Sequence, residues 1–167
     1  MIYSRPIKTL AACTGRYPTA AEEAAVLDWA SSAPRRLQAA NLIAQKEQQI
    51  VREAVDSMQP RYPKFAPQHD RAWEKANRDM GLVLRYAVQA MIVDDSDMPN
   101  DKLYVWLGTI VRSTGHTPAL FRDCYAAVIA GCRRHLSADA FEVAEPYLQR
   151  AADDMAAFGE PTKQAVN

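Results

Sequence analysis

The sequence predicts an all-α protein. Apolar residues recur at three- or four-residue intervals through most of the chain, which is the period of an amphipathic helix. Alanine is abundant, glycine occurs only 6 times, and runs of β-branched residues are short. No segment shows the clean apolar–polar alternation that is typical of a half-buried strand. The chain has 167 residues, which is enough to bury a sizeable core, and we expect one domain over 1–167.

An N-terminal helical hairpin is expected over residues 1–32. Its first helix covers Ser4–Cys13, and the Thr14–Pro18 segment breaks it because glycine and proline favour a turn there. Thr19-Ala-Ala-Glu22 matches a capping box, in which the threonine and glutamate side chains each bind a backbone N–H. It opens a second helix, which we expect to end near Ser31.

Longer helices are expected over residues 33–160. Ser32-Ala33-Pro34 starts the first, since proline is tolerated in an opening turn, and one bent helix or two helices run to about Gln59. Pro60–Pro67 contains three prolines and is expected to be a loop. The remaining helices are expected over Asp70–Val93, Asp101–Ser113, Thr117–Arg134 and Ser137–Phe158, with a turn at Asp94–Asn100 and a frayed tail over 161–167.

The bulk charge and hydropathy exclude several classes of function. Lys+Arg and Asp+Glu are 20 each, so the net charge of zero gives no support to a nucleic-acid role, which favours a basic face. No apolar run approaches eighteen residues, so no membrane span is expected. The first ten residues lack the apolar core of a signal peptide, and a cytoplasmic protein is therefore expected.

No pattern of reactive residues indicates catalysis or metal binding. Cys13, Cys124 and Cys132 are odd in number and unmatched in spacing, so neither a disulfide framework nor a zinc site is indicated. Cys124 and Cys132 lie about two helical turns apart and are interpreted as buried thiols. The chain has no Ser-His-Asp or Cys-His arrangement and no Gly-rich phosphate loop, so we expect no enzyme.

The helix expected over Asp70–Val93 places charges beside an apolar stripe. Asp79 lies on nearly the same line of the helix as Ala76 and Val83, and a buried carboxylate without a partner is costly. Two interpretations remain open. Glu74–Arg78 and Lys75–Asp79 are opposite charges at i,i+4, which fits a solvated charged face. Alternatively, these side chains bind a ligand.

Four segments in the same order resemble one known family. They are Arg16–Thr19 followed by a short acidic helix, Arg35–Ala44, Arg78–Tyr86 and His135–Tyr147. Together they resemble the phycobiliproteins, which are globin-fold light-harvesting subunits, and the similarity extends over nearly the whole chain. The resemblance implies a globin-like helical bundle with a two-helix N-terminal extension.

The chain departs from this family at the pigment-attachment position. Phycobiliproteins carry the motif Cys-x-Arg-Asp, whose cysteine holds a linear tetrapyrrole through a thioether, whereas this chain has Ala76-Asn77-Arg78-Asp79. A thioether at Ala76 is chemically impossible. By resemblance, Asp79 would accept pyrrole N–H groups, Arg78 and Lys75 would pair with propionates, and Phe121 would lie against the pigment.

Haem is not expected as a cofactor. A haem-binding globin needs an axial histidine on the helix opposite the central one, and Asp101–Ser113 contains none. His116 falls in the following turn, and His69 precedes the central helix.

Two functions follow from the resemblance. The first is non-covalent binding of a bilin of the biliverdin or phycocyanobilin type, as a carrier, chaperone or regulator, similar to the bilin-biosynthesis-associated globins. The alternative is a chromophore-free interaction protein that docks on phycobilisome subunits or pigment-metabolism enzymes. The resemblance also implies subunit contacts through Trp29 and Arg85, and a homodimer is expected because Ala11–Gly15 lacks the acid that the family pairs with Arg85.

Overall fold

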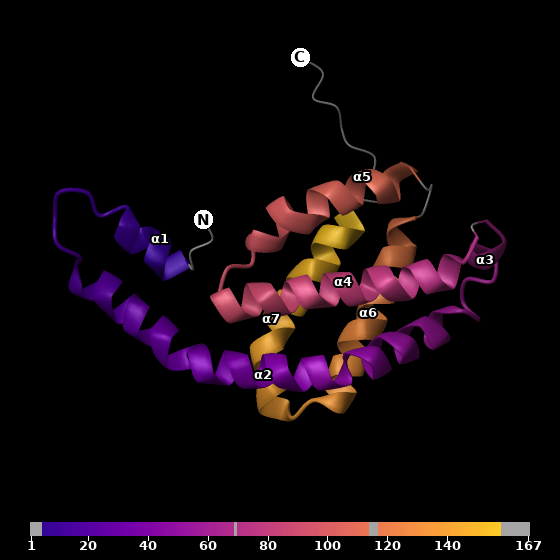
Figure 1. Ribbon diagram of the computed structural model, residues 1–167, viewed down its shortest axis with the longest axis horizontal. Helices are drawn as coiled ribbons and strands as arrows, with labels where there is room; N and C mark the ends of the chain where they lie inside the picture. The colour runs from indigo at the N-terminus through magenta and orange to yellow at the C-terminus, as the bar shows by residue number, and fades with distance from the viewer. Residues whose placement is uncertain (1–4, 69, 114–116, 158–167) are drawn as a thin grey trace, which may run out of the picture.

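Figure 1 shows the computed structural model, which describes residues 5–68, 70–113 and 117–157. Over these residues the chain forms helices joined by short turns, and no strand is present. The elements are α1 (Arg5–Ala11), α2 (Ala20–Met58), α3 (Phe65–Gln68), α4 (Ala72–Val93), the π-helix η1 (Asn100–Tyr104), α5 (Val105–Ser113), α6 (Pro118–His135) and α7 (Ala138–Ala157). The all-α prediction is confirmed.

The helix α2 is continuous over 39 residues, and the expected break near Ser32–Pro34 is wrong. Pro34 lies inside the helix and removes one backbone donor. Close to Pro34, both the Ser32 hydroxyl and the Arg36 guanidinium donate to the carbonyl of Trp29, at 2.9 and 3.0 Å. The capping box at Thr19 is confirmed and starts the helix. The residue 32 boundary of the expected hairpin therefore lies within α2.

The segment between α2 and α4 is not loop throughout. Its last residues form the short helix α3, although Pro60–Pro67 was expected to be a loop. Phe65 at the start of α3 packs against Trp73 of α4, with ring centroids 4.6 Å apart. This aromatic contact fixes α3 beside the first turns of α4.

The helix α4 begins and ends at residues in the left-handed conformation. Arg71 precedes it with φ of 53°, and Asp94 follows it with φ of 54°. The N–H groups of Asp94 and Asp95 both donate to the carbonyl of Ala90, which closes the last turn. The turn that was expected over Asp94–Asn100 begins at this point, and the π-helix η1 follows it.

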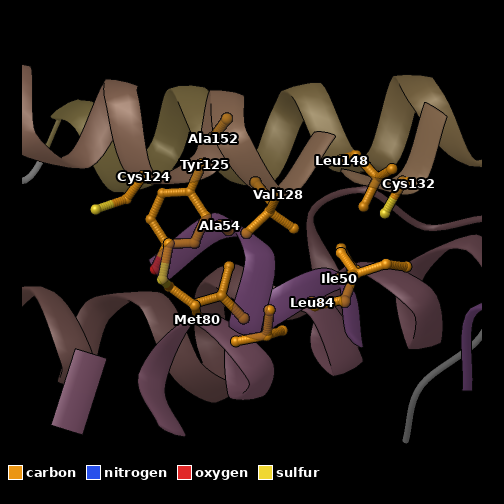
Figure 2. Close-up of a cluster of buried hydrophobic side chains, with 14 of the residues drawn as sticks. Ile50, Ala54, Met80, Leu84, Cys124, Tyr125, Val128, Cys132, Leu148 and Ala152 are labelled. Atoms are coloured by element: carbon orange, nitrogen blue, oxygen red, sulfur yellow. The ribbon is translucent and has the colours of Figure 1, made fainter. Parts of the chain in front are cut away.

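The core lies where α2, α4, α6 and α7 pack together. Figure 2 shows apolar side chains from these four helices meeting in one cluster. A Cβ built on Gly131 would lie 3.0 Å from Cγ2 of Ile50, so glycine permits the close approach of α6 to α2. Cys124 and Cys132 are buried, as expected. Among the described residues, no helix has the length and apolar character needed to cross a bilayer.

Candidate ligand-binding cavity

A cavity of about 310 Å³ opens on one side of α4. Its volume lies at the lower end of the range of small-molecule sites, which measure about 300–1,000 Å³. Side chains from α3, α4, α5, α6 and α7 line it: Phe65, Ala72, Lys75, Ala76, Arg78, Asp79, Met80, Leu107, Ile110, Leu120, Phe121, Cys124, Tyr125 and Met155. The cavity is therefore enclosed by elements that are distant in the sequence.

The residues that the sequence analysis placed around a pigment all line this one cavity. Lys75, Ala76, Arg78 and Asp79 form the α4 wall, and Phe121 faces them from α6. The i,i+3 and i,i+4 spacings on α4 put Lys75 and Asp79 on a shared face. The fold therefore brings the α4 charges and the α6 aromatic ring together, although about 40 residues separate them in the sequence.

The ion pairs on α4 differ from those expected. Arg78 binds its neighbour Asp79, with its Nε 2.8 Å from the carboxylate, so the Lys75–Asp79 pair is not formed. Glu74 binds Arg71 instead of Arg78, because the left-handed Arg71 at the helix start places its guanidinium over the first turn. This guanidinium lowers the pKa of Glu74 below its ordinary value. The expected i,i+4 pairs are therefore corrected to Arg71–Glu74 and Arg78–Asp79.

The Lys75 side chain lines the cavity as an exposed cation and forms no ion pair or hydrogen bond with the described residues, although its charge also helps to lower the pKa of Glu74. The side chain of Asp79 is 32% exposed at the same wall, so its carboxylate remains within reach of solvent. The mouth of the cavity thus carries two cations and one carboxylate on successive turns of one helix.

The inner wall is apolar and includes residues that the sequence analysis missed. Met80, Leu107, Leu120 and Met155 are buried there. Cys124 and Tyr125 of α6 complete the wall, and burial raises the pKa of the Cys124 thiol to about 12. Both follow Phe121 by one helical turn, so the i,i+3 and i,i+4 spacing from Phe121 was the signal that would have found them.

Trp29 and Arg85, which were expected at subunit contacts, do not line the cavity. The guanidinium of Arg85 makes three bonds with Glu47 of α2, at 2.6 to 3.0 Å. Trp29 lies beneath the guanidinium of Arg36, which is 5.5 Å from the ring centroid. The ion-pair partner of Arg85 is thus found within the same chain.

Two histidines bear on the expectation about haem. His69 and His116 lie outside the described residues, so their places are not assigned. In the described ranges no group of three histidine, cysteine, aspartate or glutamate side chains has the spacing of a metal site. The cavity offers a carboxylate, two cations and apolar surface instead.

This set of side chains fits a linear tetrapyrrole. Such a molecule has a row of pyrrole N–H donors, two propionates and a large apolar π-surface. The Asp79 carboxylate matches the donors, and Lys75 and Arg78 match the propionates through charge-assisted hydrogen bonds. Ala76 presents only a methyl group to the cavity, so no thioether forms there.

Comparison with known proteins agrees with this geometry. A family model described as phycobilisome protein matches residues 9–155, which include every residue that lines the cavity. No curated protein matches the chain. The matched family generally carries linear tetrapyrroles and assembles as subunits, and the helical fold described above agrees with its globin-like architecture. Residues 9–155 cover most of the chain, and the chain therefore belongs to the phycobilisome protein family.

Proposed function

We propose that this protein binds a linear tetrapyrrole non-covalently in the cavity beside α4. The observation that carries the proposal is that Lys75, Arg78 and Asp79 share one wall of an apolar cavity with Ala76, where the family's cysteine would stand. The polar half of a bilin site is present without its covalent anchor. Affinity then depends on hydrogen bonds, charge and apolar contact alone.

Binding would exchange one set of contacts for another at the α4 wall. Asp79, which bonds to Arg78 in the ligand-free protein, would accept the pyrrole N–H groups, while Arg78 and Lys75 would turn to the propionates. Arg78 is 71% exposed, so its side chain is free to reorient. Phe121 would pack against the pigment from α6. The thiol of Cys124, which lines the cavity, stays protonated at neutral pH because burial raises its pKa.

A bilin held in this way is released at equilibrium, which suits a carrier, chaperone or regulator of cytoplasmic pigment more than a permanent antenna subunit. We propose a non-catalytic role associated with bilin biosynthesis, in which the protein receives pigment and passes it on. The absence of a thiol at position 76 supports this proposal because a thioether would prevent transfer.

Titration of the purified protein with biliverdin tests the proposal. We expect a saturable, red-shifted and sharpened absorption band, since a rigid protonated or hydrogen-bonded pigment absorbs differently from a free one. The Asp79→Ala variant should raise Kd by about tenfold or more, because hydrogen bonds to charged groups contribute about 1.5–3 kcal/mol. Its stability should change by less than about 1 kcal/mol, since Asp79 forms a partly exposed ion pair.

Asp56→Ala provides the matched control. Asp56 is exposed on α2 and does not line the cavity, so its removal should leave Kd unchanged. A free-pigment spectrum at high protein concentration would exclude the proposal, as would equal affinities of the Asp79→Ala and Asp56→Ala variants.

A second candidate function is a chromophore-free interaction protein. It is favoured by the exposed apolar side chains on α5, where Val105 and Trp106 are 57% and 59% exposed. Leu27 and Tyr17 are also exposed at the N-terminal arm, which is where the family resemblance implies a homodimer. Light scattering combined with a pull-down of phycobilisome subunits or pigment-metabolism enzymes distinguishes the two. A stable complex together with no pigment affinity would establish this second function.

A further inference from the structure

The hydroxyl of Tyr125 lies on the inner wall and has no hydrogen-bond partner among the described residues. Tyr125 lines the cavity from α6 and is only 6% exposed. Its hydroxyl forms no hydrogen bond with the part of the chain that the structure describes. In Figure 2 its ring extends from α6 toward α4, where Met80 lies. Unlike Trp29 Nε1 and the Tyr104 hydroxyl, the Tyr125 oxygen is not fully buried, so it is accessible from the cavity and available to a ligand.

The electrostatics of the site keep this hydroxyl as a donor. Burial raises the pKa of Tyr125 well above its ordinary value, and the nearby Cys124, Tyr104 and Asp79 raise it further. The phenol is therefore neutral at all physiological pH values and offers one O–H to the cavity. Met80, Leu107 and Met155 line the same cavity and offer no oxygen or nitrogen acceptor.

The two walls of the cavity therefore have different chemistry. The α4 wall carries the cations Lys75 and Arg78 and the carboxylate Asp79 near solvent, whereas the inner wall carries a single hydroxyl donor. A ligand that satisfies both walls has anionic groups at the mouth and a neutral acceptor at its buried end. Open-chain tetrapyrroles have such an acceptor in the carbonyl of each terminal lactam ring. Ring-closed tetrapyrroles have the same two propionates but no terminal carbonyl.

We propose that Tyr125 selects open-chain over ring-closed tetrapyrroles by donating a hydrogen bond from its hydroxyl to the terminal lactam carbonyl of the buried ring. This inference rests on the proposed function and names the part of the ligand that the inner wall recognises. A site that provides a hydrogen bond discriminates against a ligand lacking the partner group, because the buried donor is then left unpaired.

The test compares Tyr125→Phe with wild type for two ligands, biliverdin and protoporphyrin IX. The substitution keeps the ring and its packing. We expect Kd for biliverdin to rise by about fivefold to tenfold, the usual net value of one hydrogen bond, and Kd for protoporphyrin IX to stay unchanged. An equal change for both ligands, or no change for biliverdin, would overturn the inference.

Tyr104→Phe is the matched control. Tyr104 is also a buried tyrosine whose hydroxyl has no partner, but it does not line the cavity. Removing the Tyr104 hydroxyl should change the Kd for biliverdin and the Kd for protoporphyrin IX by no more than about twofold. An effect of Tyr104→Phe as large as that of Tyr125→Phe would assign the loss to packing and would overturn the inference.

A measurement on the wild-type protein avoids any dependence on folding of the variant. The carbonyl stretch of bound biliverdin, labelled with ¹³C at the terminal lactams, should move to lower frequency for one of the two rings. Two carbonyls that both match the solvent-exposed frequency would contradict the hydrogen bond. If wild type binds no biliverdin at all, the proposed function fails as well, whereas binding without selectivity overturns only the role of Tyr125.

Discussion

The charged side chains at the two ends of α4 differ in whether they have partners within the chain. Beyond its C-terminal end, the buried Asp95 is paired with Lys8 of α1, and Asp94 accepts a hydrogen bond from the hydroxyl of Tyr147. Arg150 of α7 binds Asp97 at 3.2 Å. Toward its N-terminal end, Lys75 has no partner among the described residues, although it lines a cavity.

The difference separates structural charges from candidate binding charges. The acidic turn after α4 holds α1 and α7 in place, and every acid in it has a partner within the chain. The cavity combines an exposed cation, a partly exposed ion pair and a tyrosine hydroxyl that has no partner among the described residues. Charged and polar groups that serve no structural partner and line one cavity remain available to a ligand, which supports the proposed binding site.

The largest expected effect tests the structural side of this comparison. Arg36 is 5% exposed and donates to the carbonyls of Trp29 and Ile92, so it joins α2 to the last turn of α4. Arg36→Ala should lower the free energy of unfolding by about 2–4 kcal/mol, because it removes the hydrogen bond that joins α2 to the carbonyl of Ile92 and leaves a gap in the packing.

Urea denaturation measures this loss. The neighbouring Arg35 is exposed, so Arg35→Ala should change the stability by no more than about 0.5 kcal/mol. The assignment of Arg36 to the scaffold is wrong if the two variants lose the same stability. Pigment affinity should be retained by every variant of this pair that remains folded.

A smaller effect tests the binding side. Lys75→Ala should leave the stability unchanged, since this side chain has no partner among the described residues. It should raise Kd for biliverdin by about threefold to tenfold, through loss of one charge-assisted contact at a solvated mouth. The difference between wild type and variant should shrink at high salt, because exposed charges are screened.

Lys46→Ala removes a lysine that is exposed on α2 and does not line the cavity. Titrations with this variant should match wild type at every salt concentration. If Lys46→Ala weakens binding as much as Lys75→Ala does, the effect comes from the net charge of the protein, and the specific role of Lys75 is lost.

The smallest effect concerns the carboxylate of Glu53, whose hydrogen-bond partners all lie within the chain. Arg134, then His135 and Gln49, lower the pKa of Glu53 to about 2 by hydrogen bonds to its carboxylate. Because the folded-state pKa lies below the unfolded value, the cluster contributes stability above about pH 4.5 and loses it as the pH falls toward 2. Thermal melts of wild type and Glu53→Gln should therefore converge as the pH is lowered through this range. Curves that stay parallel would contradict the contribution of Glu53.

Much of the fold follows from patterns that are local in the sequence. The capping box at Thr19 and the helical period of the apolar residues identified the helices that the structure contains. The break expected at Pro34 is wrong, and the long-range bond of Arg36 to the carbonyl of Ile92 in α4 helps to hold this part of the continuous helix, a contact that has no local signature. The short helix α3 likewise depends on Phe65 packing against Trp73.

The candidate site was predictable on one wall only. Lys75, Arg78 and Asp79 are neighbours on one helix, so spacing and resemblance identified them together. Their ion pairs were mispredicted because the left-handed Arg71 redirects Glu74, which i,i+4 counting does not include. Cys124 and Tyr125 follow Phe121 by one helical turn, but their place at the cavity also depends on the packing of α6 against α4.

The central claim is that the cavity between α4 and α6 holds a non-covalent bilin. The most direct test is a crystal structure of the complex with biliverdin. The account predicts pigment density in this cavity, with pyrrole nitrogens within hydrogen-bond distance of Asp79 and no bond to Cys124. Pigment bound elsewhere on the protein, a thioether to Cys124, or an empty cavity at saturating pigment would contradict it.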